Sequence, residues 1–242
     1  MRRVYGLNVV SLWPYCLGLR GPEVAIEMAD TAGFEGIQVL PMKGWSYKNI
    51  RKWESRVISF ENAFMYGPLW KAVLRQLGIL GEPAPLIVDW LLFGRKVSPF
   101  FPNAIPVVHH WQRGVAVEIH PELSTSIEEY LDFCANGGRF CWDTLHVRRR
   151  RRDGSSGIDD WEKLLQALPE GAVELIHVHP KKAEIPAFLN GASTEFREML
   201  SLLGRKFPGV PAIIEVFPPL KSPRKTLEEL SDVLTVTKEW LG

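Results

Sequence analysis

Short apolar runs alternate with segments of helical periodicity along almost the whole chain. The runs consist almost entirely of apolar residues, which is typical of parallel strands that helices cover on their outer side. Eight strands are predicted: Val4–Val10, Gly36–Leu40, Arg56–Phe60, Leu86–Trp90, Val115–Ile119, Arg139–Trp142, Val173–Val178 and Pro211–Phe217.

Seven helices are predicted between and after these strands: Pro22–Ala32, Lys48–Ser55, Leu69–Leu80, Ser126–Ala135, Ile158–Leu168, Glu195–Lys206 and Thr226–Trp240. Eight short strands that alternate with helical segments in 242 residues predict a (β/α)8 TIM barrel, a fold of about 250 residues. A doubly wound open sheet is the alternative, because alternation by itself does not separate the two architectures. No linker or internal repeat interrupts the pattern, so a single domain over residues 1–242 is expected.

Composition narrows the class of protein. An apolar fraction of 46% with a net charge of +1 excludes a disordered chain, and the charge balance disfavours a dedicated nucleic-acid binder. Three cysteines without a CxxC spacing argue against a disulfide framework and fit a reducing compartment. No run of 18 apolar residues occurs, so no membrane span is expected and a cytoplasmic location is predicted.

Acidic and imidazole side chains stand at the ends of the last four predicted strands. Burying several such groups at one barrel mouth is costly unless something compensates their charge. Three carboxylates and one imidazole form a set that suits Mn²⁺ or Mg²⁺, and Zn²⁺, Co²⁺ or Fe²⁺ also accept such ligands. The sequence therefore predicts one divalent metal site at the ends of these four strands.

These segments resemble the xylose isomerase-like TIM-barrel superfamily, which includes sugar isomerases, sugar epimerases and endonuclease IV. The most specific match is the segment Cys141–His146, which fits the D-T-x-H strand end of the family. The Glu of strand five, the HxH of strand seven and the Glu of strand eight follow in the family's order. The resemblance implies that the metal ligands are Glu118, Asp143, His179 and Glu215. It also implies that His146 binds substrate or a second metal.

The predicted chemistry is proton transfer next to the carbonyl of a small polyhydroxylated substrate. Glu118 and Glu215 are expected to be the acid/base pair, while His146 stabilises the developing enediolate oxygen. Further substrate contacts are expected from residues near other strand ends: Trp13, Glu61, Asp89, Lys181 and Lys182. The two lysines could bind a phosphate or carboxylate of the substrate. This reading is a metal-dependent isomerase or epimerase of carbohydrate metabolism.

Two other functions remain open. A phosphodiesterase like endonuclease IV is favoured by the basic run Arg148–Arg152, which also keeps nucleic acid open as a partner. It is opposed by the lack of histidines after strands three and four, where Glu61 and Asp89 stand, and of an Asp-x-His after strand seven. The third reading is a barrel without catalysis that binds a small ligand.

Three other histidines are not expected to be ligands. His109 and His110 fall in an irregular segment before strand five, and adjacent side chains point in different directions. His177 shares a strand face with His179 and is interpreted as a partner of the site.

Overall fold

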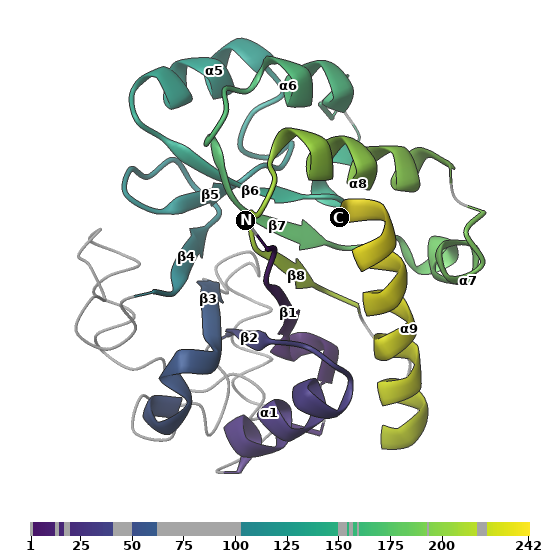
Figure 1. The fold of residues 1–242 in the computed structure, drawn as a ribbon. Coiled ribbons are helices and arrows are strands. Elements are labelled where there is room, and N and C mark those ends of the chain that lie inside the picture. The colour runs from purple at the N-terminus through teal and green to yellow at the C-terminus, as the bar shows by residue number, and fades with distance from the viewer. Residues whose placement is uncertain are drawn as a thin grey trace.

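A closed barrel of eight parallel strands, β1 to β8 in chain order, forms the centre of the computed structural model (Figure 1). The structure describes residues 2–12, 15–16, 20–40, 50–61, 103–149, 154, 157–158, 160–192, 194–216 and 222–242. Strand β1 pairs with β2 on one side and with β8 on the other, which closes the sheet. The predicted (β/α)8 barrel is confirmed, and the open doubly wound sheet is excluded.

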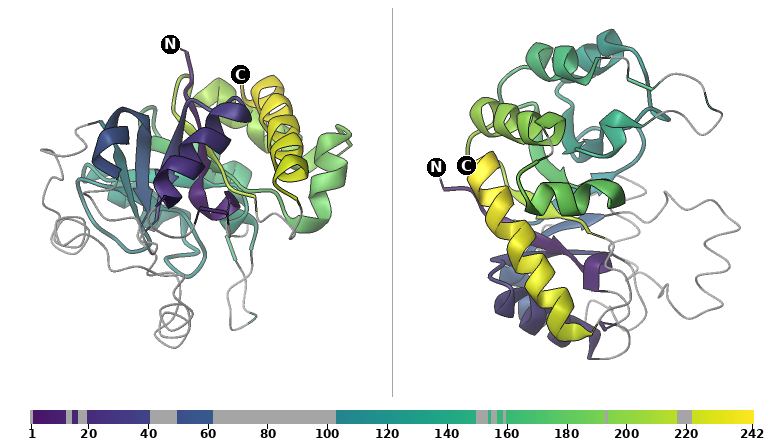
Figure 2. Two further views of the ribbon diagram at one scale, coloured as in Figure 1. Left: turned by 90° about the horizontal axis from the view of Figure 1, so that it is seen from below. Right: turned by 90° about the vertical axis from the view of Figure 1, so that its right-hand side faces the viewer.

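The strands are β1 Tyr5–Asn8, β2 Gly36–Val39, β3 Val57–Glu61, β4 Ile105–Val108, β5 Ala116–Glu118, β6 Arg139–Asp143, β7 Val173–Val178 and β8 Ala212–Ile214. The described α-helices lie outside the strands in the views of Figure 2: α1 Gly21–Thr31, α5 Ile127–Ala135, α6 Trp161–Ala167, α7 Ile185–Leu189, α8 Thr194–Lys206 and α9 Pro223–Leu241. Short 3-10 helices are η1 Val9–Leu12, η2 Arg51–Arg56, η4 His146–Arg148 and η5 Lys182–Glu184. No helix in these described ranges has the length and apolar character of a membrane span.

The fourth strand of the barrel is not the predicted one. Ile105–Val108 fills this position and pairs with β3 and β5, whereas Leu86–Trp90 and the helix predicted at Leu69–Leu80 lie outside the described residues. The segment reads as irregular in the sequence because Pro106 interrupts the apolar run, and proline is rare inside strands. Strand four therefore ends at Val108, directly before His109.

The lower part of the barrel interior is apolar. Side chains alternate along each strand, and one alternate set packs together inside the barrel: Val107, Ala116, Cys141, Leu175 and Ile213, with Ile58 and Ile105 against them. Glycine makes room for this floor, because a Cβ on Gly6 would lie only 2.5 Å from Cδ1 of Ile58 and 2.6 Å from Cδ1 of Ile213. The floor closes the interior below the polar residues that end the strands.

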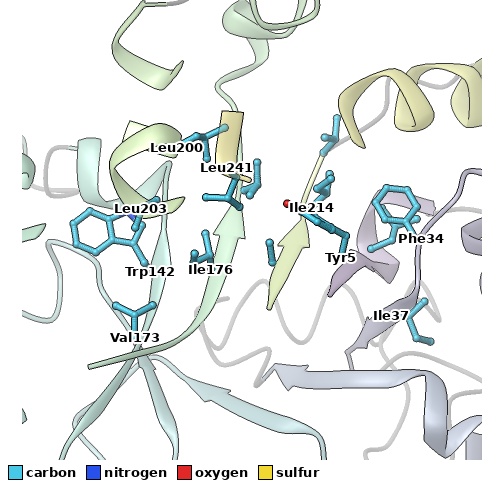
Figure 3. Packing of buried hydrophobic residues seen from close by; sticks show 14 of the residues in the cluster. Tyr5, Phe34, Ile37, Trp142, Val173, Ile176, Leu200, Leu203, Ile214 and Leu241 are labelled. Atoms are coloured by element: carbon cyan, nitrogen blue, oxygen red, sulfur yellow. The ribbon is translucent and has the colours of Figure 1, made fainter. Parts of the chain in front are cut away.

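The opposite faces of the strands pack against the helices and form the main core. Figure 3 shows part of this core, in which Trp142 and Ile176 of the sheet lie near Leu200 and Leu203 of α8. Helix ends are capped locally: the Ser126 hydroxyl accepts a hydrogen bond from Glu129 N, and the Asp160 carboxylate accepts one from Lys163 N. These contacts fix the helices that hold the strands in register.

A buried arginine joins the beginning and the end of the barrel. The Arg3 side chain, just before β1, donates hydrogen bonds to the backbone carbonyls of Phe207 at 3.1 Å and Gly242 at 3.1 Å, and also to that of Val210. Phe207 follows α8, Val210 precedes β8, and Gly242 follows α9. One guanidinium therefore satisfies carbonyls of three elements that meet at the closure of the sheet.

We expect Arg3→Ala to lower the free energy of unfolding by about 2–4 kcal/mol, because it leaves several buried carbonyls without a donor. Arg2→Ala is the matched control. The Arg2 side chain is 84% exposed, and its contact within the described residues is a surface ion pair with Glu35, so its loss should cost less than about 1 kcal/mol. Chemical denaturation of the two variants measures the difference, and equal costs would contradict this role of Arg3.

Candidate active site

Each strand of the barrel has a polar side chain at its last or next-to-last residue, or directly after its end, and these side chains belong to one network above the apolar floor. Most of these side chains are buried, and the side chain of His109 is only 10% exposed. Because the carboxyl ends of parallel strands meet at one mouth, the eight residues converge. In order from β1 to β8 they are Asn8, Gln38, Glu61, His109, Glu118, Asp143, His177 and Glu215.

Asp143, the last residue of β6, presents one carboxylate oxygen to three imidazoles. Its Oδ1 accepts hydrogen bonds from the backbone N–H groups of Leu145 and His146, both at 2.7 Å. Its Oδ2 has no hydrogen-bond partner within the described part of the chain. This oxygen lies 3.6 Å from His177 Nδ1, 3.7 Å from His179 Nδ1 and 3.8 Å from His146 Nδ1. Burial raises the pKa of Asp143, but the surrounding histidines outweigh it and keep the net pKa well below the usual range.

Glu118, at the end of β5, is held as a carboxylate. Its Oε1 is hydrogen-bonded to Nδ1 of His146, and its Oε2 lies 3.3 Å from Nε2 of His109 and 3.3 Å from Nδ1 of His177. Burial opposes the charge, yet His109 and His146 overcome this effect, and the pKa of Glu118 lies well below its ordinary value.

Glu215, just after β8, has the opposite environment. Burial is the largest influence and raises its pKa to about 7; His179 lowers the pKa, and the nearby Glu61 raises it further. The two glutamates are therefore set apart in acidity. They belong to β5 and β8, which flank the β6–β7 pair in the barrel.

The loops after β6 and β7 are tied to each other. The Thr144 hydroxyl accepts a hydrogen bond from His179 N at 2.7 Å. The Arg148 side chain donates to Thr144 O at 2.6 Å and to both carboxylate oxygens of Glu184, at 2.7 and 3.1 Å. These contacts fix the backbone that carries His146 and His179.

The first arginine of the basic run Arg148–Arg152 is buried and takes part in these contacts. The Arg148 side chain is 2% exposed and lies over the ring of Phe196, with its guanidinium carbon 4.9 Å from the ring centre. Arg149 is exposed, and the other three arginines lie outside the described residues.

The structure brings the expected metal ligands into two overlapping groups. Ligand atoms of Asp143, His179 and Glu215 lie within 4.8 Å of one another, and so do those of Glu118, Asp143 and His146. Asp143 is common to both groups. The unpartnered Oδ2 of Asp143 lies where a cation would meet carboxylate and imidazole donors, so the residues fit a divalent ion.

Of the five other residues expected to contact substrate, the structure describes three, and one of these belongs to the polar network. Glu61 ends β3, and its Oε2 accepts a hydrogen bond from Asn8 Nδ2 at 3.2 Å. Lys181 and Lys182 are exposed at the start of η5. Trp13 and Asp89 lie outside the described residues, and Asp89 does not belong to the strand that fills the fourth position.

Three residues of the polar network are absent from the sequence-based prediction. His109 lies 3.5 Å from Glu61 Oε1 through its Nε2, and its segment Val107-Val108-His109 does repeat the pattern of apolar residues before a polar one. Asn8 and Gln38 are single polar residues within predicted strands, so each could have been identified as facing the barrel interior. Asn8 Nδ2 donates to Gln38 Oε1 at 2.9 Å, and Gln38 Nε2 lies 2.9 Å from His177 Nε2.

No protein-family model matches the chain, and no curated protein matches it in sequence. In structure, the chain is similar to D-allulose 3-epimerase from Methylomonas sp. in complex with D-allulose. The TM-score is 0.58 at 14% identity, over 99% of this chain and 97% of that chain. A second structure of that enzyme, with additional C-terminal residues, matches with a TM-score of 0.58 at 14% identity, over 99% and 98% of the two chains.

A xylose isomerase domain containing protein from Salmonella typhimurium LT2 is also similar, with a TM-score of 0.53 at 11% identity over 97% of each chain. Identities of 11–14% show a shared fold and leave the activity to be argued from the site. The chain therefore has the fold of the xylose isomerase-like TIM barrels that its sequence resembles.

Proposed function

We propose that the protein is a divalent-metal-dependent enzyme of the sugar isomerase or epimerase type. Its substrate is a small polyhydroxylated carbonyl compound, with or without a phosphate group, and its reaction is proton transfer by carboxylates. The crystallised complex of the similar epimerase with D-allulose supports a ketose as the first substrate class to test.

The observation that carries this proposal is the contrast between the two buried glutamates. Histidines hold Glu118 in its charged form, whereas burial raises the pKa of Glu215 to about 7. A pair of carboxyl groups whose environments separate their pKa values supplies a base and an acid at the same pH. This arrangement suits a reaction that removes one proton and returns another.

The proposed metal ligands are Glu118, Asp143, His179 and Glu215. When bound, a divalent ion in this donor set would polarise the substrate carbonyl and acidify the adjacent C–H bond. Asp143 has one oxygen fixed by two backbone N–H groups, so the other oxygen is held in a defined direction. The hydrogen bonds of Thr144 and Arg148 hold the loop of His179 against the loop of His146.

In the proposed reaction, Glu118 takes a proton from the carbon next to the carbonyl, which leaves an enediolate. Glu215, as a carboxylic acid on the other side of the β6–β7 pair, returns a proton to the substrate carbon. Return to the opposite face of the planar intermediate inverts that carbon, so this placement favours epimerisation. His146 orients Glu118 through its Nδ1 and carries positive charge near neutral pH: burial lowers its pKa, but Asp143 and Glu118 raise the net value to about 9.

Glu118→Gln and Glu215→Gln should each lower turnover by about 10²–10⁴-fold or more, because each amide removes one partner of the proton transfer. The assay is epimerisation and solvent deuterium incorporation over a panel of ketoses with and without phosphate. Glu198→Gln, a change of the same kind at an exposed residue of α8, should leave activity unchanged. Full activity in either site variant, with circular dichroism showing a folded protein, would refute the acid/base assignment.

Binding of Mn²⁺ should release protons near pH 7. Burial lowers the pKa of His179, but Glu215 and Asp143 raise it to a net value above the usual one. The imidazole therefore holds its proton more strongly than a free histidine does, and a cation must displace this proton to bind the ring nitrogen. Glu215 keeps the proton that the reaction uses, so release of about one proton at most is expected, and affinity should rise with pH as His179 loses its proton.

Titration calorimetry in two buffers of different ionisation enthalpy counts the released protons. Asp143→Asn should abolish binding, whereas Asp132→Asn, at an exposed position of α5, should not change it. Binding without proton release would contradict the ligand set. Absence of any divalent-ion binding would favour the reading of the barrel as a non-catalytic ligand-binding protein.

A metal-dependent phosphodiesterase is the second candidate function. It is favoured by His109, which does follow strand four and forms a possible ligand group with Glu61 and Glu118. No histidine occurs between Lys181 and the end of the chain, so an Asp-x-His after strand seven is still missing. Nicking of abasic-site DNA in the presence of Zn²⁺ would support this candidate, and the absence of nicking would favour the epimerase.

A further inference from the structure

The two histidines of the β7 HxH sequence face the same polar interior but differ in their hydrogen bonding. We propose that Gln38 fixes His177 as the tautomer with its proton on Nδ1, so that His177 places an N–H group among three carboxylates and leaves metal binding to His179. Gln38 is a positioning residue in this arrangement. The division of roles between the histidines rests on the proposed metal centre, whereas the tautomer of His177 does not.

The chain of hydrogen bonds that sets the tautomer begins at a backbone N–H. Val10 N donates to Asn8 Oδ1 at 3.0 Å, and this identifies the oxygen of the Asn8 amide. The amide nitrogen of Asn8 then donates to Glu61 Oε2 at 3.2 Å and to Gln38 Oε1 at 2.9 Å. A carboxylate only accepts hydrogen bonds, so the orientation of Asn8 is fixed from both ends.

The orientation of the Gln38 amide sets the tautomer of the His177 ring. Because Oε1 of Gln38 accepts from Asn8, its Nε2 is the atom that lies 2.9 Å from His177 Nε2. An amide NH₂ group only donates, so Nε2 of His177 must accept with its lone pair. The proton of the neutral ring is then on Nδ1.

Nδ1 of His177 lies among the acidic groups of the site. It is 3.3 Å from Glu118 Oε2, 3.6 Å from Asp143 Oδ2 and 3.9 Å from Glu215 Oε2. An N–H group at this point offsets the repulsion between three buried carboxylates. Both ring nitrogens of His177 are then occupied, so neither offers a lone pair to a cation.

The competing state is a doubly protonated ring. Burial lowers the pKa of His177, whereas Cys141, Asp143 and Glu118 raise it, and these neighbours together favour a second proton. That proton would be on Nε2, where it would face the donor hydrogens of Gln38. The Gln38 amide therefore opposes the charged ring, and the two states differ in the protonation of Nε2.

Nitrogen-15 NMR of the histidine-labelled protein distinguishes these states. The signals of His177 are identified by their loss in His177→Gln. In the wild-type protein we expect a proton on Nδ1 of His177 and none on Nε2. In Gln38→Glu, a carboxylate of the same shape accepts from Asn8 and from the ring, so a proton should appear on Nε2.

Gln38→Met keeps the size of the side chain and removes the donor that faces Nε2 of His177, so a proton should appear on Nε2 while Nδ1 keeps its own. This variant maintains the test if Gln38→Glu does not fold. Gln166→Glu, the same change at an exposed position of α6, should leave every histidine signal in place. A proton on Nε2 of His177 in the wild-type protein, or no change in a folded Gln38 variant, would overturn the proposal.

Addition of Zn²⁺ to the labelled wild-type protein tests the proposed metal centre separately from the tautomer of His177. We expect the ring signals of His179 to shift while Nδ1 of His177 keeps its proton. Loss of the Nδ1 proton of His177 would show that it is a ligand and would overturn the proposal. If no histidine signal moves and His177 keeps its tautomer, the proposed metal centre is wrong and the role of Gln38 stands.

Discussion

The burial of four carboxyl groups at one end of a closed barrel is the constraint on which the rest of the structure depends. Glu61, Glu118, Asp143 and Glu215 are each at most 6% exposed, and such groups repel one another strongly where water is excluded. Histidines compensate this repulsion, and their N–H groups lie between the acidic side chains. A cation would provide the same compensation, so the buried carboxyl groups that cost free energy are also the groups that could hold a metal ion.

Inward-facing residues along the strands change from apolar to polar toward the strand ends. The residues of the apolar floor stand two positions before polar residues of the network in β4 to β8. Ile58 and Ile213 pack beside Gly6 in this floor, and the polar layer lies on the side of the loops that follow the strands. Arg148 and Thr144 then fix two of these loops, which gives His146 and His179 defined positions without long insertions.

The sequence was sufficient for the barrel and for the acidic end of the site, because strands five to eight each combine an apolar run with an unmistakable carboxylate or histidine. It was insufficient at strand four. Pro106 interrupts the apolar run there, so the strand was not predicted and His109 was not identified as the residue that follows it. It also could not indicate the roles of Asn8 and Gln38. Their importance comes from hydrogen bonds across the barrel, between β1, β2 and β7, and such contacts depend on closure of the sheet rather than on local sequence.

In the proposed metal centre, Glu118, Asp143, His179 and Glu215 hold one divalent cation between two carboxyl groups of different acidity. A crystal structure of the Mn²⁺-soaked protein, with anomalous diffraction recorded at the manganese edge, tests this centre most directly. We predict one strong anomalous peak at bonding distance from Asp143, His179 and Glu215, with Glu118 completing the protein ligands. A peak bound by Nδ1 of His177, or no peak at the end of the barrel, would contradict it.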